Sequence, residues 1–191
     1  MQTFSTAIVL AGTLTLLLLV ESAIPKEPIP DADSQATAKE TINEVYEGEL
    51  HDAKKSAAIS QLASTILQDA KDSKTDAASR YVLLKMAGKL AVRSRKASLA
   101  MQVVDEMDKQ FEIDALQIKF LTLQNLATKS PDAEQSEAML KHLISLTDAL
   151  AKHERFDQAI QMLRTARAAA RKSRDTESLK KGITDLRNKY F

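Results

Sequence analysis

Apolar residues recur every three or four positions through the chain after residue 34, and this period constrains the fold more than any other feature. The spacing places an apolar stripe along each of a series of amphipathic helices. The composition agrees, because only four glycines and four prolines occur among 191 residues, and these two residue types interrupt helices most strongly. Eight helices are predicted, with approximate bounds 35–53, 56–72, 76–94, 97–110, 114–128, 132–152, 156–171 and 176–190.

The connections between the later predicted helices are short, and their length determines how the helices pack. A link of a few residues forces neighbouring helices to lie antiparallel. No run of alternating polar and apolar residues is long enough for a strand. The sequence therefore predicts an all-α fold of antiparallel helical hairpins, stacked either in a tetratricopeptide-like array or in an irregular bundle.

The apolar stripes also predict which side chains enter the core. Val45 shares a stripe with Ile42 in the first helix, and Leu121 belongs to the stripe of the fifth. The stripe of the third helix is expected to be buried, and it consists of Tyr81, Leu84, Ala87, Leu90 and Ala91.

The first twenty residues contain no charged side chain, and 7–20 form a continuous apolar run. An apolar segment of this length at the N-terminus is typical of an export signal, although no Lys or Arg precedes it. Residues 1–22 are thus predicted to be a signal peptide, cleaved after Ser22 or Ala23, and the protein to be exported to the periplasm or secreted. The alternative is that residues 1–20 stay in the membrane as an uncleaved anchor.

Residues 23–33 hold three of the four prolines and show no periodicity. This composition predicts an extended linker. Ser34 is expected to cap the first helix, and 34–191 to form one helical domain. Because the chain has no cysteine, disulfides, thiol chemistry and thiolate metal sites are excluded and apolar packing must stabilise the fold.

Two stretches have the residue spacing of a tetratricopeptide repeat. The stretch 146–166, LTDALAKHERFDQAIQMLRTA, resembles that family closely, and 87–107 repeats the pattern more weakly. The resemblance implies that Ala159 lets the two helices of a hairpin approach, while Leu146, Leu150 and Phe156 fill the space between them. The family's turn glycine is replaced by Arg95 in one copy and by Glu154 in the other.

A second resemblance concerns residues 76–127. This stretch is similar to helical segments of exported bacterial proteins of unassigned function. The similarity implies a helper or scaffold role and brings no catalytic residue with it.

Catalytic and metal-binding patterns are missing from the sequence. The histidines, at His51, His142 and His153, do not share the spacing of helical metal ligands. Glu40, Glu44 and Glu47 lie on one helix face, which indicates a solvated surface more than a cation site. No nucleophile elbow, phosphate loop or dinucleotide-binding pattern occurs. The sequence therefore predicts no enzymatic activity, metal or cofactor.

The strongest candidate for binding is the third predicted helix. Residues 80–96 contain six basic residues and no acidic one, and Lys85, Lys89 and Arg93 recur at helical spacing. If the tetratricopeptide register holds, Lys85 and Lys89 face a groove in which that family grips peptide carboxylates. The alternative is that these side chains only cover the apolar stripe with their stems.

A basic C-terminal stretch is a rival surface, and it includes Arg167, Arg171, Lys172 and Arg174. Nucleic acid is not expected as a partner, because no aromatic residues are interleaved with the arginines. The expected function is that of an exported, non-enzymatic interaction or scaffold protein that binds a protein or an acidic peptide. The alternative is a membrane-tethered adaptor that keeps its leader, and the oligomeric state is left open.

Overall fold

The computed structural model describes residues 25–73, 76–128, 133–171 and 177–190. In these residues the fold is all-α, which confirms the prediction from the sequence. The helices are α1 (Ala32–Val45), α2 (Glu47–Asp52), α3 (Ser56–Asp72), α4 (Ala77–Arg93), α5 (Ala97–Gln110), α6 (Ala115–Thr128), α7 (Ala133–Lys152), α8 (Phe156–Ala170) and α9 (Glu177–Tyr190). The predicted signal peptide, residues 1–22, lies outside the described part of the chain.

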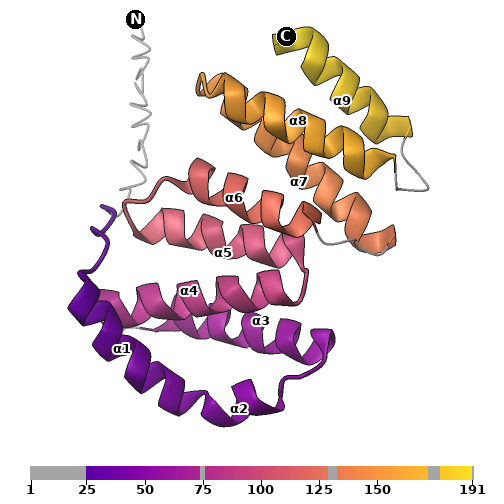
Figure 1. Cartoon of the computed structure of the whole chain (residues 1–191). Coiled ribbons are helices and arrows are strands. Elements are labelled where there is room, and N and C mark those ends of the chain that lie inside the picture. Colours follow the sequence, from indigo (N-terminus) through magenta and orange to yellow (C-terminus); the bar gives the residue numbers. More distant parts are fainter. Residues whose placement is uncertain (1–24, 74–75, 129–132, 172–176, 191) are drawn as a thin grey trace, which may run out of the picture.

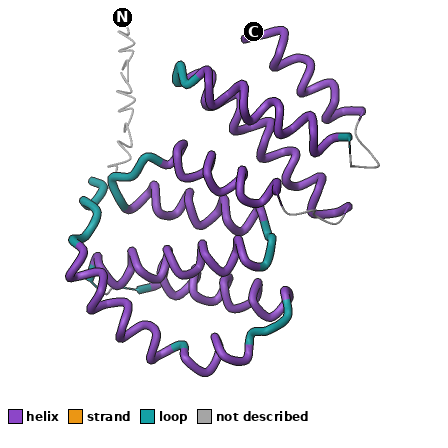
Figure 2. Tube along the Cα trace, in the orientation of Figure 1, coloured by secondary structure: helices purple, strands orange, loops and turns teal. Residues whose placement is uncertain are grey.

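The helices form two layers that the chain crosses alternately (Figure 1). The helices α3, α5, α7 and α9 contact one another in series in one layer, and α1, α4, α6 and α8 do so in the other. From α3 onward each helix also packs against the next along the chain as an antiparallel pair. Short loops join α4 to α5, α5 to α6 and α7 to α8 (Figure 2), as the linker lengths predict.

The first predicted helix differs from the expectation. It begins at Ala32, because Asp31 rather than Ser34 is its N-cap and accepts the Ser34 N–H at 2.9 Å. It also breaks at Tyr46 into α1 and α2. The Tyr46 hydroxyl donates to Asp69 on α3 at 2.5 Å. Val45, expected in the core, is the last residue of α1 and is 66% exposed.

Small residues let α3 and α4 approach closely at the centre of the core. Ala63 and Ala70 of α3, and Ala87 and Ala91 of α4, are completely buried. All five side chains expected to be buried on the third predicted helix, which is α4, are buried, as are Leu146, Leu150 and Ala159. Two further expectations were wrong, since Leu121 is 53% and Phe156 is 45% exposed. Leu121 lies on α6 and Phe156 is the first residue of α8.

The hairpins α4–α5 and α7–α8 close with the same turn. Arg95 has a φ of 60° and Glu154 a φ of 59°, the left-handed region in which glycine is usual at a helix end. In the first turn Lys96 N–H bonds the Ala91 carbonyl at 3.0 Å; in the second, Arg155 N–H bonds the Leu150 carbonyl at 2.9 Å. The two positions identified from the sequence as lacking a turn glycine therefore adopt glycine-like backbone.

The described part of the predicted linker is docked on the helical domain. We call residues 25–31 the N-terminal strap. Glu27 N–H donates to the Gln110 carbonyl at 2.7 Å, and the Glu27 carbonyl accepts from Glu112 N–H at 2.9 Å, in an isolated parallel bridge beside Phe111. Lys26 pairs with Asp108 at 2.7 Å. The backbone of this segment is thus fixed at the α5–α6 turn, and residues 32–33 of the predicted linker belong to α1 instead.

Candidate functional site

The predicted basic residues of α4 all project into solvent. Lys85, Lys89 and Arg93 are exposed and follow one another at successive turns of the helix. Asp76 caps the N-terminus of this helix, since its carboxylate accepts the Ser79 N–H at 3.0 Å. The buried stripe on the opposite side of α4 holds the helix against α3 and α5, so the direction of the basic face is fixed by the core.

Lys85 and Lys89 lie at a groove formed by α4, α5 and α6, and Arg93 lies outside its lining. The groove has a volume of about 430 Å³, which is within the usual range of about 300–1,000 Å³ for ligand sites. The other lining residues are uncharged and mostly apolar: Tyr81, Leu84, Gly88, Val92, Ala100, Val103, Val104, Met107, Ile118 and Thr122. The structure thus brings two of the three predicted site residues to an apolar surface.

The two groove lysines have different surroundings. The Lys85 ammonium donates to Gln35 Oε1 of α1 at 2.9 Å and lies 5.3 Å from the centre of the Tyr81 ring. Gln35 is itself held, because its Nε2 donates to the Pro30 carbonyl at 2.7 Å. Lys89 makes no hydrogen bond or ion pair with the described residues. One ammonium is therefore held in place beside the groove, and the other is available to a ligand.

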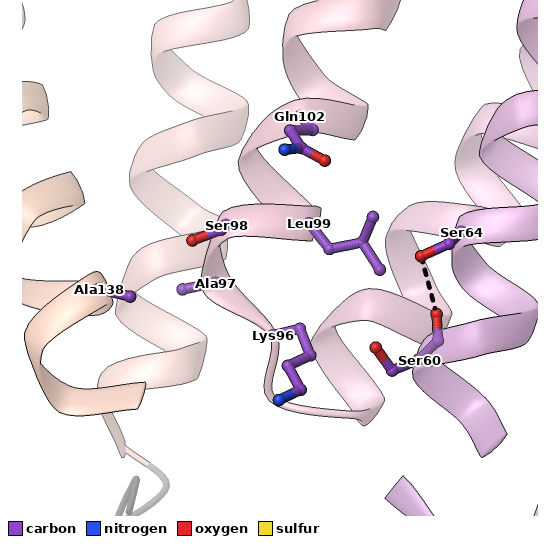
Figure 3. A pocket seen from close by; sticks show the side chains of 8 residues that line it. All are labelled: Ser60, Ser64, Lys96, Ala97, Ser98, Leu99, Gln102 and Ala138. Carbon is purple, nitrogen blue, oxygen red and sulfur yellow. Dashed lines mark hydrogen bonds between the residues drawn. The ribbon is translucent and has the colours of Figure 1, made fainter. Parts of the chain in front are cut away.

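A second hollow lies on the opposite layer, between α3, α5 and α7 (Figure 3). Its volume is about 330 Å³, and its lining is Ser60, Ser64, Lys96, Ala97, Ser98, Leu99, Gln102 and Ala138. The Ser64 hydroxyl donates to the Ser60 carbonyl at 3.1 Å, so that this hydroxyl is already committed within α3. The hollow is more polar than the α4–α6 groove, and Lys96 is its one charged lining residue.

A serine–histidine pair next to this hollow was not predicted from the sequence. His142 Nε2 lies 3.1 Å from the Ser98 hydroxyl, although the two residues are 44 positions apart. Burial lowers the pKa of His142. A nucleophilic serine needs a base whose second nitrogen is oriented by another group. Among the described residues no carboxylate hydrogen-bonds this ring, and Asp105, the nearby acid, is bound by Lys119 at 2.5 Å.

The other histidines and the glutamates that were considered as metal ligands do not form a common site. His51 pairs with Asp52 at 3.1 Å. His153 is exposed, as are Glu40 and Glu44 of α1 and Glu47 of α2. Within the described residues no group of three or more metal-ligating side chains converges. No helix in that part of the chain is both long and apolar enough to cross a membrane.

The C-terminal basic surface lies where α8 meets α9. Arg167, Arg171 and Lys180 line a shallow hollow of about 340 Å³ with Ala170, Ile183 and Thr184. Lys180 is partly neutralised by Glu177 at 3.2 Å. Lys172 and Arg174, the other members of this predicted surface, lie outside the described residues. The described part of this surface thus lies at the C-terminal end of the stack, whereas α4 lies between α1 and α6 (Figure 1).

No protein-family model, curated protein or solved structure matches this chain.

Proposed function

We propose that this chain is an exported, non-enzymatic helical interaction or scaffold protein that binds a protein or peptide partner in the cell envelope. The observation that carries the proposal is the α4–α6 groove, in which an apolar lining meets the ammonium groups of Lys85 and Lys89. Apolar area supplies affinity and the cations supply selectivity for an acidic partner. The proposal includes a tetratricopeptide-like stack, which the shared turn of α4–α5 and α7–α8 supports.

Export is proposed from the uncharged N-terminal twenty residues. The rival proposal is a membrane-tethered adaptor that retains them. In that case the strap matters, because docking of residues 25–31 would hold the α5–α6 turn of the domain close to the membrane. Both proposals leave the α4–α6 groove free to bind.

The mature N-terminus in the native host distinguishes the two proposals. Mass spectrometry of the protein from a soluble extract should find a start at residue 23 or 24. An intact Met1 recovered in the membrane pellet would replace the exported form with the tethered one.

A pull-down from host envelope extract tests the binding function. The wild-type chain should retain a partner that a Lys85→Glu, Lys89→Glu variant loses, while circular dichroism shows that both chains fold. A partner retained equally by both chains would leave the function in place and remove the groove from it. Absence of any partner for the wild type would contradict the proposed function itself.

A further inference from the structure

We propose that the α4–α6 groove binds an amphipathic acidic helix of the partner, with the carboxylates of that helix at Lys89 and Lys85. The inference rests on the proposed function and specifies the chemistry of the partner. It follows from three properties of the groove: the placement of its charges, its length, and the preset position of one lysine.

The charges lie on one side of the groove only. Both charged lining residues belong to α4, whereas the α5 and α6 residues that line it are uncharged. A ligand that fills this site must therefore present an apolar surface to Val104 and Ile118 and a negative edge to α4. A uniformly charged polymer would desolvate its charges against the apolar lining, which is costly. An apolar chain without an acid would leave Lys89 unused.

The α4 side of the groove is long enough to contact a docked helix. Along α4 its lining runs from Tyr81 to Val92, about 16 Å at about 1.5 Å per residue. That length equals three turns of a docked helix. Amphipathic helices bind such grooves through residues at i, i+3 or i+4, and i+7. Lys85 and Lys89 are also four positions apart, so they match two carboxylates one turn apart on the ligand.

Lys85 is positioned before any ligand arrives. Gln35 accepts from its ammonium at 2.9 Å and is itself held to the Pro30 carbonyl of the strap at 2.7 Å. An ammonium has three donors, so two remain for a ligand carboxylate. Preorganisation of this kind lowers the entropic cost of binding. Gln35 is thus a positioning residue, and it links the strap to the groove.

Gly88 leaves room between the two lysines. A Cβ at this position would lie 3.4 Å from Val103 Cγ1, so Gly88→Ala adds a methyl group to the lining of the groove. Alanine is also the better helix former. The variant should therefore be as stable as the wild type, or more so, and yet bind less tightly. A change that only disturbed folding would lower stability and binding together.

The experiment uses fluorescence anisotropy with the leaderless chain, residues 25–191, and synthetic fourteen-residue probes. The first probe is a labelled amphipathic helix with a leucine stripe flanked by two glutamates at i and i+4. The second has glutamine at those two positions, the third has the same composition in scrambled order, and the fourth is polyglutamate. We expect the first probe to bind most tightly and to lose affinity as salt is raised, because exposed charges are screened.

Variants of the protein locate the site. Lys89→Gln and Lys85→Gln should each lower the affinity for the first probe about three- to fivefold, and together about tenfold, which is the size of effect expected from losing exposed ion pairs. Arg93→Gln is the matched control, since Arg93 is on the same exposed face but outside the lining, and it should change binding less than twofold. Gln35→Glu should weaken the probe by neutralising Lys85, whereas Gln35→Ala should do so less. Thr122→Trp should block the groove.

Three results would overturn the inference. The first is that polyglutamate binds as tightly as the first probe. The second is that Arg93→Gln lowers the affinity for the first probe as much as Lys89→Gln does. The third is that the fatty acid dodecanoate binds in the groove while no peptide probe binds. Each would leave the proposed function in place if the envelope pull-down still recovers a partner. Loss of the pull-down partner from the wild type would instead contradict the function.

Discussion

Two residues of this chain hold a backbone conformation that is normally left to glycine. Arg95 and Glu154 close equivalent hairpins with positive φ values, which cost an L-residue about 1–2 kcal/mol. The hydrogen bonds across each turn, together with the packing of the helices beside it, compensate this cost. Nothing in the sequence identifies the conformation directly, because neither position is glycine or asparagine.

Glycine at either turn should therefore stabilise the domain. Arg95→Gly and Glu154→Gly each remove the unfavourable Cβ. Glycine also gives the unfolded chain more freedom, which offsets part of the gain, so the free energy of unfolding should rise by about 0.5–1 kcal/mol. Urea unfolding of each variant measures the difference. Arg164→Gly, at an exposed position inside α8, is the control and should cost about 1 kcal/mol. If both turn variants proved less stable than the wild type, the left-handed turns would be contradicted.

A second residue-scale feature is the carboxylate of Asp148, which joins α9 to α7. It lies 2.6 Å from Lys152 Nζ, 2.7 Å from the Tyr190 hydroxyl and 3.2 Å from Lys189 Nζ. Lys152, then Tyr190 and Lys189, lower the pKa of this carboxyl from its usual 3.8 to about 2. In the folded state Asp148 is thus a better-stabilised anion than in the unfolded chain.

This shift predicts how acid acts on the domain. Because the pKa is depressed on folding, the contribution of Asp148 is complete above pH about 4 and is lost as the pH falls towards about 2. The carboxylate is partly exposed, so about 1 kcal/mol is expected. Asp148→Asn should lower the free energy of unfolding at pH 7 by that amount and reduce its decrease between pH 4 and pH 2. Asp185→Asn, on the exposed side of α9, should retain the wild-type decrease.

At the scale of the element, helical periodicity predicted most of the chain, and its failures have local causes. The α3 to α6 bounds lie within a residue or two of the prediction. The prediction for the first helix was wrong about its cap at Ser34 and about its continuity at Tyr46. Both the Asp31 cap and the Tyr46–Asp69 hydrogen bond depend on side-chain geometry. The exposure of Leu121 could not be predicted, because an apolar residue on a helix does not reveal whether another helix covers it.

The candidate site was predictable in part for the same reason. The lysines of α4 follow from charge and spacing within one helix. The lining from α5 and α6 depends on how those helices cross α4, and Gln35 reaches Lys85 from 50 positions away. The contact of His142 with Ser98 depends in the same way on the packing of α7 against α5. Interactions between distant segments cannot be read from a local period.

The α7–α8 crossing provides a test of helix packing. Ala159 is completely buried there, so Ala159→Leu should overpack the contact and cost about 1–3 kcal/mol. Ala169 on the same helix is unsuitable as a control, because it packs against the core. Ala168 is exposed on the same helix and is the better control; Ala168→Leu should change stability by less than about 0.5 kcal/mol. Thermal and urea unfolding of both variants would show equal costs only if the crossing were elsewhere.

At the scale of the whole molecule, the two-layer arrangement consists of contacts between near neighbours in the chain, and the strap is an exception. It joins the start of α1 to the turn between α5 and α6, 84 positions away at the Glu27–Phe111 bridge. Phe111 is completely buried, and its ring meets the Tyr81 ring edge-on at 5.1 Å between centroids. Glu27 also pairs with Arg80 of α4. The strap therefore bridges elements that the regular stack would leave separate.

Removal of the strap should loosen this end of the molecule while the helices stay formed. A chain that starts at residue 31 keeps the Asp31 cap but loses the Glu27 bridge and part of the cover over Phe111, and it should be about 2 kcal/mol less stable to urea. A chain that starts at residue 25 is the matched control. Hydrogen exchange should show the Glu112 amide, which bonds the Glu27 carbonyl at 2.9 Å, protected in the control and unprotected after truncation. Equal stability and equal protection in the two chains would mean that the strap is undocked in solution, and that Gln35 holds Lys85 without its help.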